Sequence, residues 1–296
     1  MYHIPVLLKK VVEILDLKPG DFFIDGTLGS GGHSEVILKK LNAGKFLGVD
    51  LDLESLNLAK KRLTQVLKDK QIKLVFRNGN FADLTTILKQ EKLGKADGLL
   101  LDLGFSSIQL QSGKGFSFSG KSEPLLMIYS PEYTPVKELL KKMNQKELAW
   151  VLKIYGEERY AKRIAKAIKE RERIKPIETN LELAEVVKLA VPLSYRRRRI
   201  HPATKTFLAL RIFANRELEN LEKVLNNLPE ILKPNGRVVV ISFNSLEDRI
   251  VKNKFRQLAK EEKVKIITKK PVVPDPEEIK FNPRSRSAKL RAAIVS

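Results

Sequence analysis

Apolar runs of strand length alternate with amphipathic segments of helix length over the first third of the chain, and this order constrains the fold more than any other feature. A strand that is followed by a helix and another strand usually pairs with that strand in parallel, because the helix returns the chain to the same end of the sheet. The pattern predicts an α/β, Rossmann-like fold with a parallel-type sheet covered on both faces. The expected strands lie at 21–27, 44–52, 72–81 and 96–104, and the expected helices at 33–41, 53–68 and 81–93.

The alternation stops after the fourth strand and resumes near the end of the chain. Residues 109–133 are rich in Gly, Ser and Pro, and residues 135–193 have helical periodicity throughout. One long amphipathic helix is expected at 207–232, followed by a turn and a strand at 233–243. We therefore expect an all-helical domain inserted into the α/β domain. The predicted boundaries are 1–109 and 205–296 for the core, and 110–204 for the insert.

The charge of the chain indicates what class of partner it binds. The 296 residues include 56 Lys and Arg against 35 Asp and Glu, which gives a formal net charge of +21. An excess of this size favours a polyanion such as nucleic acid, and the alternative is a Lys-rich surface that is simply solvated. No strongly apolar face lies beside a basic one, which disfavours an anionic membrane as the partner.

Composition also excludes several classes of site. There is no cysteine, so the chain has neither disulfides nor thiolate metal ligands, and its three histidines show no ligand spacing. No metal is expected. No apolar run is long enough to cross a bilayer, and the N-terminus lacks the pattern of a signal peptide, so a cytoplasmic location is expected.

A glycine-rich turn, "DGTLGSGGH" at Asp25–His33, joins the first expected strand to the first expected helix. Its spacing is neither the dinucleotide motif G-x-G-x-x-G nor the phosphate loop that requires a Lys after the last glycine. Asp50 closes the second strand, where a carboxylate can accept both hydroxyls of a ribose, and Asp25 could pair with an amine. A ligand with a ribose and an aminoacyl group but no phosphate is S-adenosylmethionine. The alternative is that the glycines only form a tight turn.

A third carboxylate, Asp102, ends the apolar fourth strand. Ligands of open α/β sheets bind outside the carboxyl ends of the strands, and a carboxylate in apolar surroundings is costly unless it is paired or used. Asp102 is therefore a candidate functional residue beside the cofactor pocket. The alternative is a turn aspartate or a helix N-cap.

Taken together, these segments resemble the bacterial small-subunit ribosomal RNA cytosine-N4 methyltransferases, which use S-adenosylmethionine. The resemblance runs in order from His3 to Ala293. The segments that carry it are "HIPVLL", "DGTLGSGGHS", "VDLD", "DGLLLDLGFSSIQL", "GFSF", "YGEERYAKRIAKAI", "HPATKTFLALRIFANREL", "SFNSLEDRIVK" and "NPRSRSAKLRAA".

The resemblance implies a class I methyltransferase core with an inserted substrate-recognition domain, and a partner that is the small ribosomal subunit or its 16S rRNA. The oligomeric state, monomer or homodimer, stays open. The implied cofactor-binding residues are Gly31, Gly32, His33, Asp50, Phe81, Asp102 and Gln109.

The chemistry of the base suggests further residues. The exocyclic amine of cytosine is a poor nucleophile, so it must be held in line with the methyl group by hydrogen-bond acceptors. Asp102, helped by the carbonyls of Leu103 and Gly104, is the candidate acceptor, and Asn244 could orient the base. A base that leaves its stack also needs an apolar platform. Phe105, Phe116 and Phe118 are candidates for this platform, and the alternative is that they pack the insert against the core.

Two basic stretches, 195–201 and 280–291, are candidate phosphate contacts. The first could instead be a solvated loop and the second an edge strand.

Several positions depart from the family pattern. After "GFSF", Leu126, Ile128 and Ser130 stand where Asp, Arg and Asp are expected, and Lys114 replaces an Arg. Leu208 and Asn244 stand where Gln and His are expected, whereas the glycine turn and its carboxylates are intact. Two alternatives to methylation of cytosine therefore remain. One is a weakly catalytic or non-catalytic ribosome-assembly factor that keeps the cofactor pocket, and the other is a methyltransferase with another acceptor.

Overall fold

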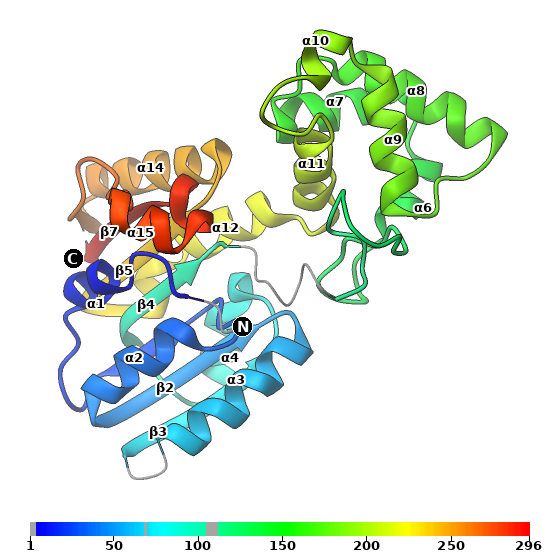
Figure 1. Cartoon of the computed structure of the whole chain (residues 1–296). Coiled ribbons are helices and arrows are strands. Elements are labelled where there is room, and N and C mark those ends of the chain that lie inside the picture. The colour runs from blue at the N-terminus through cyan, green and yellow to red at the C-terminus, as the bar shows by residue number, and fades with distance from the viewer. Residues whose placement is uncertain (1–3, 68–69, 105–111) are drawn as a thin grey trace. The chain divides into compact units, whose positions relative to one another are not determined.

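The computed structural model describes residues 4–67, 70–104 and 112–296, which form two compact units (Figure 1). Unit 1 consists of Met1–Gly104 and Leu218–Ser296, and unit 2 is Phe105–Glu217. Unit 2 thus continues beyond residue 204, where the sequence predicts the return to the core. The reason is that α11 (Thr204–Ala214) packs on α7 (Gln145–Gly156), so closely that a Cβ at Gly156 would lie 2.6 Å from the Lys205 carbonyl oxygen.

Seven strands form the sheet of unit 1 in the order β3–β2–β1–β4–β5–β7–β6. The pairs among β1 to β5 are parallel, whereas β7 is antiparallel to both of its neighbours, β5 and β6. The predicted α/β, Rossmann-like fold class is confirmed. The strands are β1 (Phe22–Asp25), β2 (Ala43–Asp50), β3 (Gln71–Asn78), β4 (Ala96–Asp102), β5 (Leu232–Ser242), β6 (Val264–Ile266) and β7 (Lys289–Val295).

Alternate residues of the strands enter two separate apolar cores, one on each face of the sheet. Phe22 and Ile24 pack in one core, and Phe23 between them packs in the other. This period of two explains why the central strands are apolar throughout. The helical elements of unit 1 are α1 (Leu8–Leu15), α2 (Gly32–Leu41), α3 (Leu53–Val66), η1 (Phe81–Asp83), α4 (Leu84–Gln90), α12 (Glu217–Asn226), α13 (Leu228–Ile231), α14 (Ser245–Lys260), α15 (Pro276–Phe281) and η2 (Pro283–Ser287).

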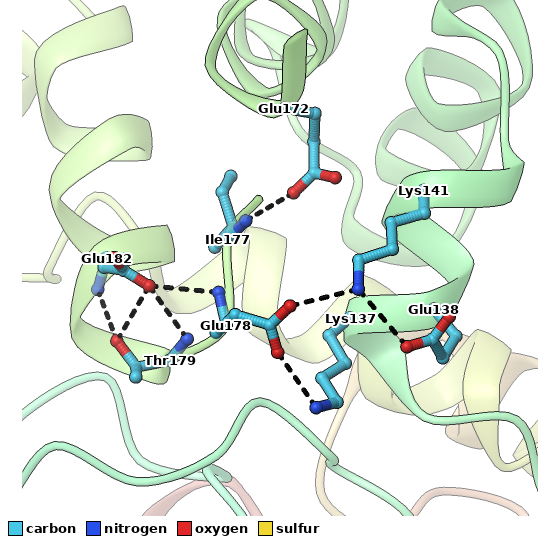
Figure 2. A network of polar contacts seen from close by, with 8 residues as sticks. All are labelled: Lys137, Glu138, Lys141, Glu172, Ile177, Glu178, Thr179 and Glu182. Atoms are coloured by element: carbon cyan, nitrogen blue, oxygen red, sulfur yellow. Dashed lines mark hydrogen bonds and ion pairs between the residues drawn. The ribbon is translucent and has the colours of Figure 1, made fainter. Parts of the chain in front are cut away.

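Unit 2 is helical, with a core of its own. Figure 2 shows a polar network within it, where Lys137 and Lys141 both bond to Glu178, at 2.9 and 3.0 Å. Thr179 and Glu182 form a capping box that fixes the start of α9. Besides α7 and α11, its helices are α6 (Val136–Lys142), α8 (Ala161–Ile174), α9 (Asn180–Ala190) and α10 (Leu193–Arg196). Across the described parts of both units, no helix is long and apolar enough to cross a membrane.

The prediction of a single helix at 207–232 is wrong. The segment forms α11, α12 and α13, and the chain breaks at Arg216, which has a left-handed φ of +52°. The neighbouring Asn215 is buried, and its amide binds the backbone of two residues far away in the chain, Tyr129 N at 2.9 Å and Met127 O at 2.8 Å. The helical periodicity predicts that the helix continues through Asn215, but these tertiary contacts hold this residue at the point where the helix ends.

Candidate active site

Three carboxylates lie at the carboxyl ends of three adjacent strands. Asp25 ends β1, Asp50 ends β2 and Asp102 ends β4. Strand β1 lies between β2 and β4, so the strand order reverses here, and this is where open α/β sheets bind their ligands. The N–H of Gly26 donates to the carbonyl of Leu100 at 2.9 Å and ties the ends of β1 and β4 together.

The glycine turn crosses the end of β2 and begins α2. Gly29 and Gly31 have φ values of +51° and +77°, and Gly31 is the N-cap of α2. An L-residue in this left-handed region costs about 1–2 kcal/mol, so the backbone favours glycine here. Gly32 is the first residue of the helix, and a Cβ at Gly31 would lie 3.4 Å from Ala59 and Leu63 of α3, so this glycine also allows the turn to pack closely on that helix.

Asp50 is held by two backbone donors. Its Oδ2 accepts from Gly29 N at 2.6 Å, and its Oδ1 accepts from Asp52 N at 2.8 Å. Burial raises the pKa of Asp50 to about 6, against the lowering effect of these N–H groups. A carboxylate has about four acceptor positions, so each oxygen can still accept one hydroxyl. Asp50 therefore fits the ribose role that the sequence predicts.

Asp25 is engaged within the protein. It is only 2% exposed, its Oδ2 accepts from Ser34 Oγ at 2.6 Å, and its Oδ1 accepts from Thr27 N at 3.1 Å. Burial raises the pKa of Asp25 to about 6, while the bond from Ser34 acts in the opposite direction. Through these two hydrogen bonds Asp25 stabilises the glycine turn from within the protein. The burial of this carboxylate is thus explained without the amine-binding role considered from the sequence.

His33 and Asp102 face each other. The Nε2 of His33 lies 2.8 Å from the Val6 carbonyl oxygen, which can only accept, so Nε2 carries the hydrogen. Burial lowers the pKa of His33, which is 6% exposed, and keeps the ring neutral. The Nδ1 lone pair then lies 3.6 Å from Oδ2 of Asp102. Two acceptors at this distance form a place for a group with N–H donors.

Asp102 is placed by its own backbone and by two small residues. Its N–H donates to Thr27 Oγ1 at 2.6 Å, and Gly104 N donates to its Oδ1 at 3.3 Å. A Cβ at Gly104 would lie 2.8 Å from the Phe243 ring and 3.0 Å from Oδ1 of Asp102. Glycine is therefore needed at position 104 for the Asp102 carboxylate to lie where it does. The side chain of Asp102 is 11% exposed.

Phe81 starts η1 directly after the loop that follows β3, and the structure places it beside the glycine turn. A Cβ at Gly26 would lie 3.2 Å from the Cβ of Phe81. The ring is partly buried against the core of unit 1. Phe81 thus comes to the same sheet edge as Asp50 and Asp102, whereas Gln109 and Phe105 lie outside the described residues.

Asn244 follows β5 and is the N-cap of α14. Its Oδ1 accepts from Leu246 N and Glu247 N, both at 3.0 Å, and Glu247 completes the capping box. The adjacent Phe243 touches the position of Gly104, so the cap lies next to the Asp102 turn. The acceptor atom of Asn244 is used by the helix, and only its Nδ2 donors remain for a substrate.

The other aromatic candidates are packing residues of unit 2. Phe116 stacks on Tyr129 with ring centroids 5.4 Å apart, and Phe118 stacks on His201 at 4.7 Å. Both rings thus pack against other residues of unit 2.

Two of the departures from the family pattern, Leu126 and Ile128, lie in the apolar core of unit 2. Ile128 is 8% exposed, and Leu126 packs against the same cluster of residues. Apolar side chains at these two positions are explained by burial. Ser130 is partly exposed and its Oγ accepts from Glu132 N at 3.4 Å, while Leu208 is partly buried on α11.

The two basic stretches differ in the structure. Arg197, Arg198 and Arg199 are exposed after α10. In the second stretch, Arg291 is 7% exposed and its Nε lies 2.6 Å from Oδ1 of Asp248. It lies on β7, which is paired on both sides, so the edge-strand alternative is wrong.

Sequence reasoning did not single out Thr27 and Ser34 as positioning residues. Both hydroxyls bond within the site, one to Asp102 N and the other to Asp25. The sequence signal for such a role is their position, because Thr27 lies within the glycine turn and Ser34 directly follows it. In the part of the chain that the structure describes, no three His, Cys, Asp or Glu side chains come together as metal ligands.

Residues 1–295 match the MraW methylase family. A Koribacter versatilis (strain Ellin345) protein named Ribosomal RNA small subunit methyltransferase H is 45% identical over 298 residues, which cover 98% of this chain and 93% of that protein. Proteins of the same name from Thermotoga neapolitana and Halothermothrix orenii are 44% and 43% identical, and cover 99% and 98% of this chain and 95% and 97% of their own lengths. The resemblance drawn from the sequence is confirmed, and the chain belongs to the MraW methylase family.

Proposed function

We propose that this protein transfers a methyl group from S-adenosylmethionine to the N4 amine of a cytosine in 16S rRNA, in the small ribosomal subunit or its precursor. The observation that carries the proposal is the acceptor pair of His33 Nδ1 and Asp102 Oδ2, 3.6 Å apart at the carboxyl edge of the sheet. The names of the relatives, 43–45% identical over nearly the whole chain, support an rRNA substrate.

The residues present fit the cofactor. Asp50 keeps acceptor positions for the two ribose hydroxyls while Gly29 N and Asp52 N hold it in place. The turn at Gly31 and Gly32 offers its backbone and the start of α2 without side chains in the way. Phe81 would contact the adenine, and Gln109 is proposed for the edge of the pocket by its family position.

When bound, S-adenosylmethionine supplies an electrophilic methyl group on a sulfonium. The protein must position the acceptor, because the lone pair of the cytosine amine is conjugated with the ring. Oδ2 of Asp102 would accept a hydrogen bond from this amine and hold its nitrogen in line for attack. A fixed carboxylate in a largely buried site would also stabilise the positive charge that develops on the nitrogen, and Oδ2 of Asp102 would then take the proton that the nitrogen releases and pass it to solvent.

The base itself needs a donor, because cytosine presents acceptors at N3 and O2. The Nδ2 group of Asn244 is proposed for this contact, since its Oδ1 is bound to the start of α14. His at this family position could likewise donate from a ring nitrogen. We therefore assign Asn244 to orientation of the base, with Asp102 as the catalytic acceptor.

The test is methyl transfer from labelled cofactor to small subunits that lack the native mark, followed by mass spectrometry of the nucleosides. N4-methylcytidine from the wild type, greatly reduced by Asp102→Asn, is the expected result. Asp83→Asn is the control, because it removes the charge of an exposed carboxylate that bonds to Lys223 on the surface. Tight binding of cofactor and subunit without any methylated nucleoside would instead establish the assembly factor, and a different methylated molecule would establish another acceptor.

A further inference from the structure

A basic cavity of about 270 Å³ lies in unit 1 between α14, the end of β6 and β7. Four of its lining residues carry positive charge, and no lining residue is acidic. They come from separate parts of the chain, which only the fold brings together. The cavity is lined by Lys252, Phe255, Arg256, Ile266, Thr268, Lys269 and Arg291.

Among the described residues, three of these cations have no carboxylate partner in an ion pair. Arg291 is held by Asp248, with Nε–Oδ1 and Nη2–Oδ2 distances of 2.6 and 3.3 Å. Within the described residues, Lys252, Arg256 and Lys269 have no ion pair of this kind. Like charges gathered around one cavity repel one another, and a bound anion relieves this repulsion.

Two further features give the cavity hydrogen-bond donors in fixed positions. Arg291 is nearly buried, and its pair with Asp248 immobilises the guanidinium. Oγ1 of Thr268 accepts from Ala292 N at 2.9 Å, so its hydroxyl hydrogen is directed to some other acceptor. A tetrahedral oxyanion accepts such bonds on several oxygens at once, as phosphate does with Arg and Lys.

Two of the lining residues, Thr268 and Lys269, lie toward the sheet edge that carries Asp102. Strand β6 is antiparallel to β7, which is antiparallel to β5, so the carboxyl ends of β6, β5 and β4 point the same way. Thr268 and Lys269 directly follow that end of β6. Strands are spaced by about 4.8 Å, so three spacings separate β6 from β4 by about 14 Å across the sheet. The register puts Ile266 level with Leu99, three residues before Asp102. A single strand of RNA with its target base at Asp102 would reach the cavity with a phosphate a few nucleotides away.

We propose that this cavity is a phosphate subsite that holds the RNA backbone a few nucleotides from the methylated cytosine. The inference rests on the proposed function for its choice of RNA. It assigns Lys252, Arg256 and Lys269 to substrate binding, which the family resemblance did not do. Removing them weakens RNA binding without changing cofactor binding.

The experiment measures binding of a fluorescent single-stranded RNA to the full chain by anisotropy at several salt concentrations. The variant K252A/R256A/K269A is compared with K254A/K260A/K265A, which removes the same charge from α14 and β6 at residues that do not line the cavity. We expect about a tenfold loss of affinity for the cavity variant and less than threefold for the control. The slope of log Kd against log salt should fall by about 0.7 for each RNA phosphate that the variant no longer neutralises.

Unchanged affinity for S-adenosylmethionine in both variants shows that unit 1 is folded. Equal losses in the two variants would overturn the subsite, because net charge alone would then explain them. If inorganic phosphate displaced the RNA from the cavity at a concentration as low as that of the RNA itself, the assignment to RNA would be overturned. The cavity would then be a site for a free anion. Failure of the proposed function looks different: the two variants still differ in RNA binding, but the wild type forms no N4-methylcytidine.

Discussion

The carboxyl edge of the sheet in unit 1 and the segment 124–130 in unit 2 use polar residues in opposite ways. At the sheet edge, backbone N–H groups hold the carboxylates of Asp50 and Asp102 in place. In the segment, Leu126 and Ile128 stand where the family resemblance predicts charged residues, and they pack in an apolar core. Polar side chains are thus held in place at the sheet edge, whereas the segment in unit 2 is apolar and packed. The following experiments test whether changes in one region leave the properties of the other region unaltered.

Asp102→Ala should have the largest effect on activity. Loss of a positioned acceptor typically costs about 10²–10³ in rate. We expect this loss in single-turnover methyl transfer, measured with saturating RNA and cofactor. The circular dichroism spectrum and the melting temperature should change little, since Asp102 N–H still donates to Thr27. A rate within threefold of the wild type would remove Asp102 from the chemistry.

Ile128→Ala should mainly destabilise unit 2. Ile128 is 8% exposed in its core, and truncation of a buried Ile costs about 2–4 kcal/mol. Denaturant unfolding of the full chain should show the loss, whereas calorimetric affinity for S-adenosylmethionine should stay the same. Ile154→Ala is the matched control, because this side chain is 43% exposed. Weakened cofactor binding in the Ile128 variant would show that the two units are energetically coupled.

Gly31→Ala should cost about 1 kcal/mol of stability and also weaken cofactor binding. The φ of +77° disfavours any L-residue, and the turn lies at the candidate cofactor site. Gly94→Ala separates the two effects, since Gly94 has a φ of +76° with open space around its Cβ position. The site would be supported if both variants lost the same stability and only Gly31→Ala bound S-adenosylmethionine more weakly. Equal cofactor affinity in both variants would reduce the glycine turn to a purely structural feature.

The pH dependence should be the smallest effect. Burial raises the pKa of Asp25 and Asp50 to about 6 in the folded state, so the native protein binds more protons than the unfolded chain between pH 4 and 6. Stability from these two groups is therefore greatest at low pH and falls as the pH rises to about 6. Asp248 acts in the opposite sense, because Arg291 holds its pKa below the ordinary value, and its contribution is lost as the pH falls below about 4.

Denaturant midpoints of the wild type and Asp50→Asn between pH 4 and 6.5 check this sign. The wild type should lose stability relative to the variant as the pH rises. The reverse trend would mean that Asp50 is stabilised as a carboxylate in the fold, with a lowered pKa.

Much of the unit 1 fold was predictable because its signals are local. Apolar strands with amphipathic helices between them specify a covered parallel sheet, and parallel strands necessarily bring Asp50 and Asp102 to one edge. The helix expected at 207–232 failed because Asn215 is bound to Met127 and Tyr129, which no local pattern reveals. Asn244 likewise reads as a substrate residue in the sequence, while the fold also uses it as a helix cap.

The sequence by itself determined the α/β order of elements, the glycine turn and the family, since these depend on residues that are neighbours or on a pattern that runs along the whole chain. Only the tertiary structure decided that Nδ1 of His33 faces Asp102, that Arg291 pairs with Asp248, and that Lys252 and Lys269 share one cavity. The physical reason is that these contacts join segments far apart in the chain. Their distances are set by how strands and helices pack, and no periodicity or spacing in the sequence contains that information.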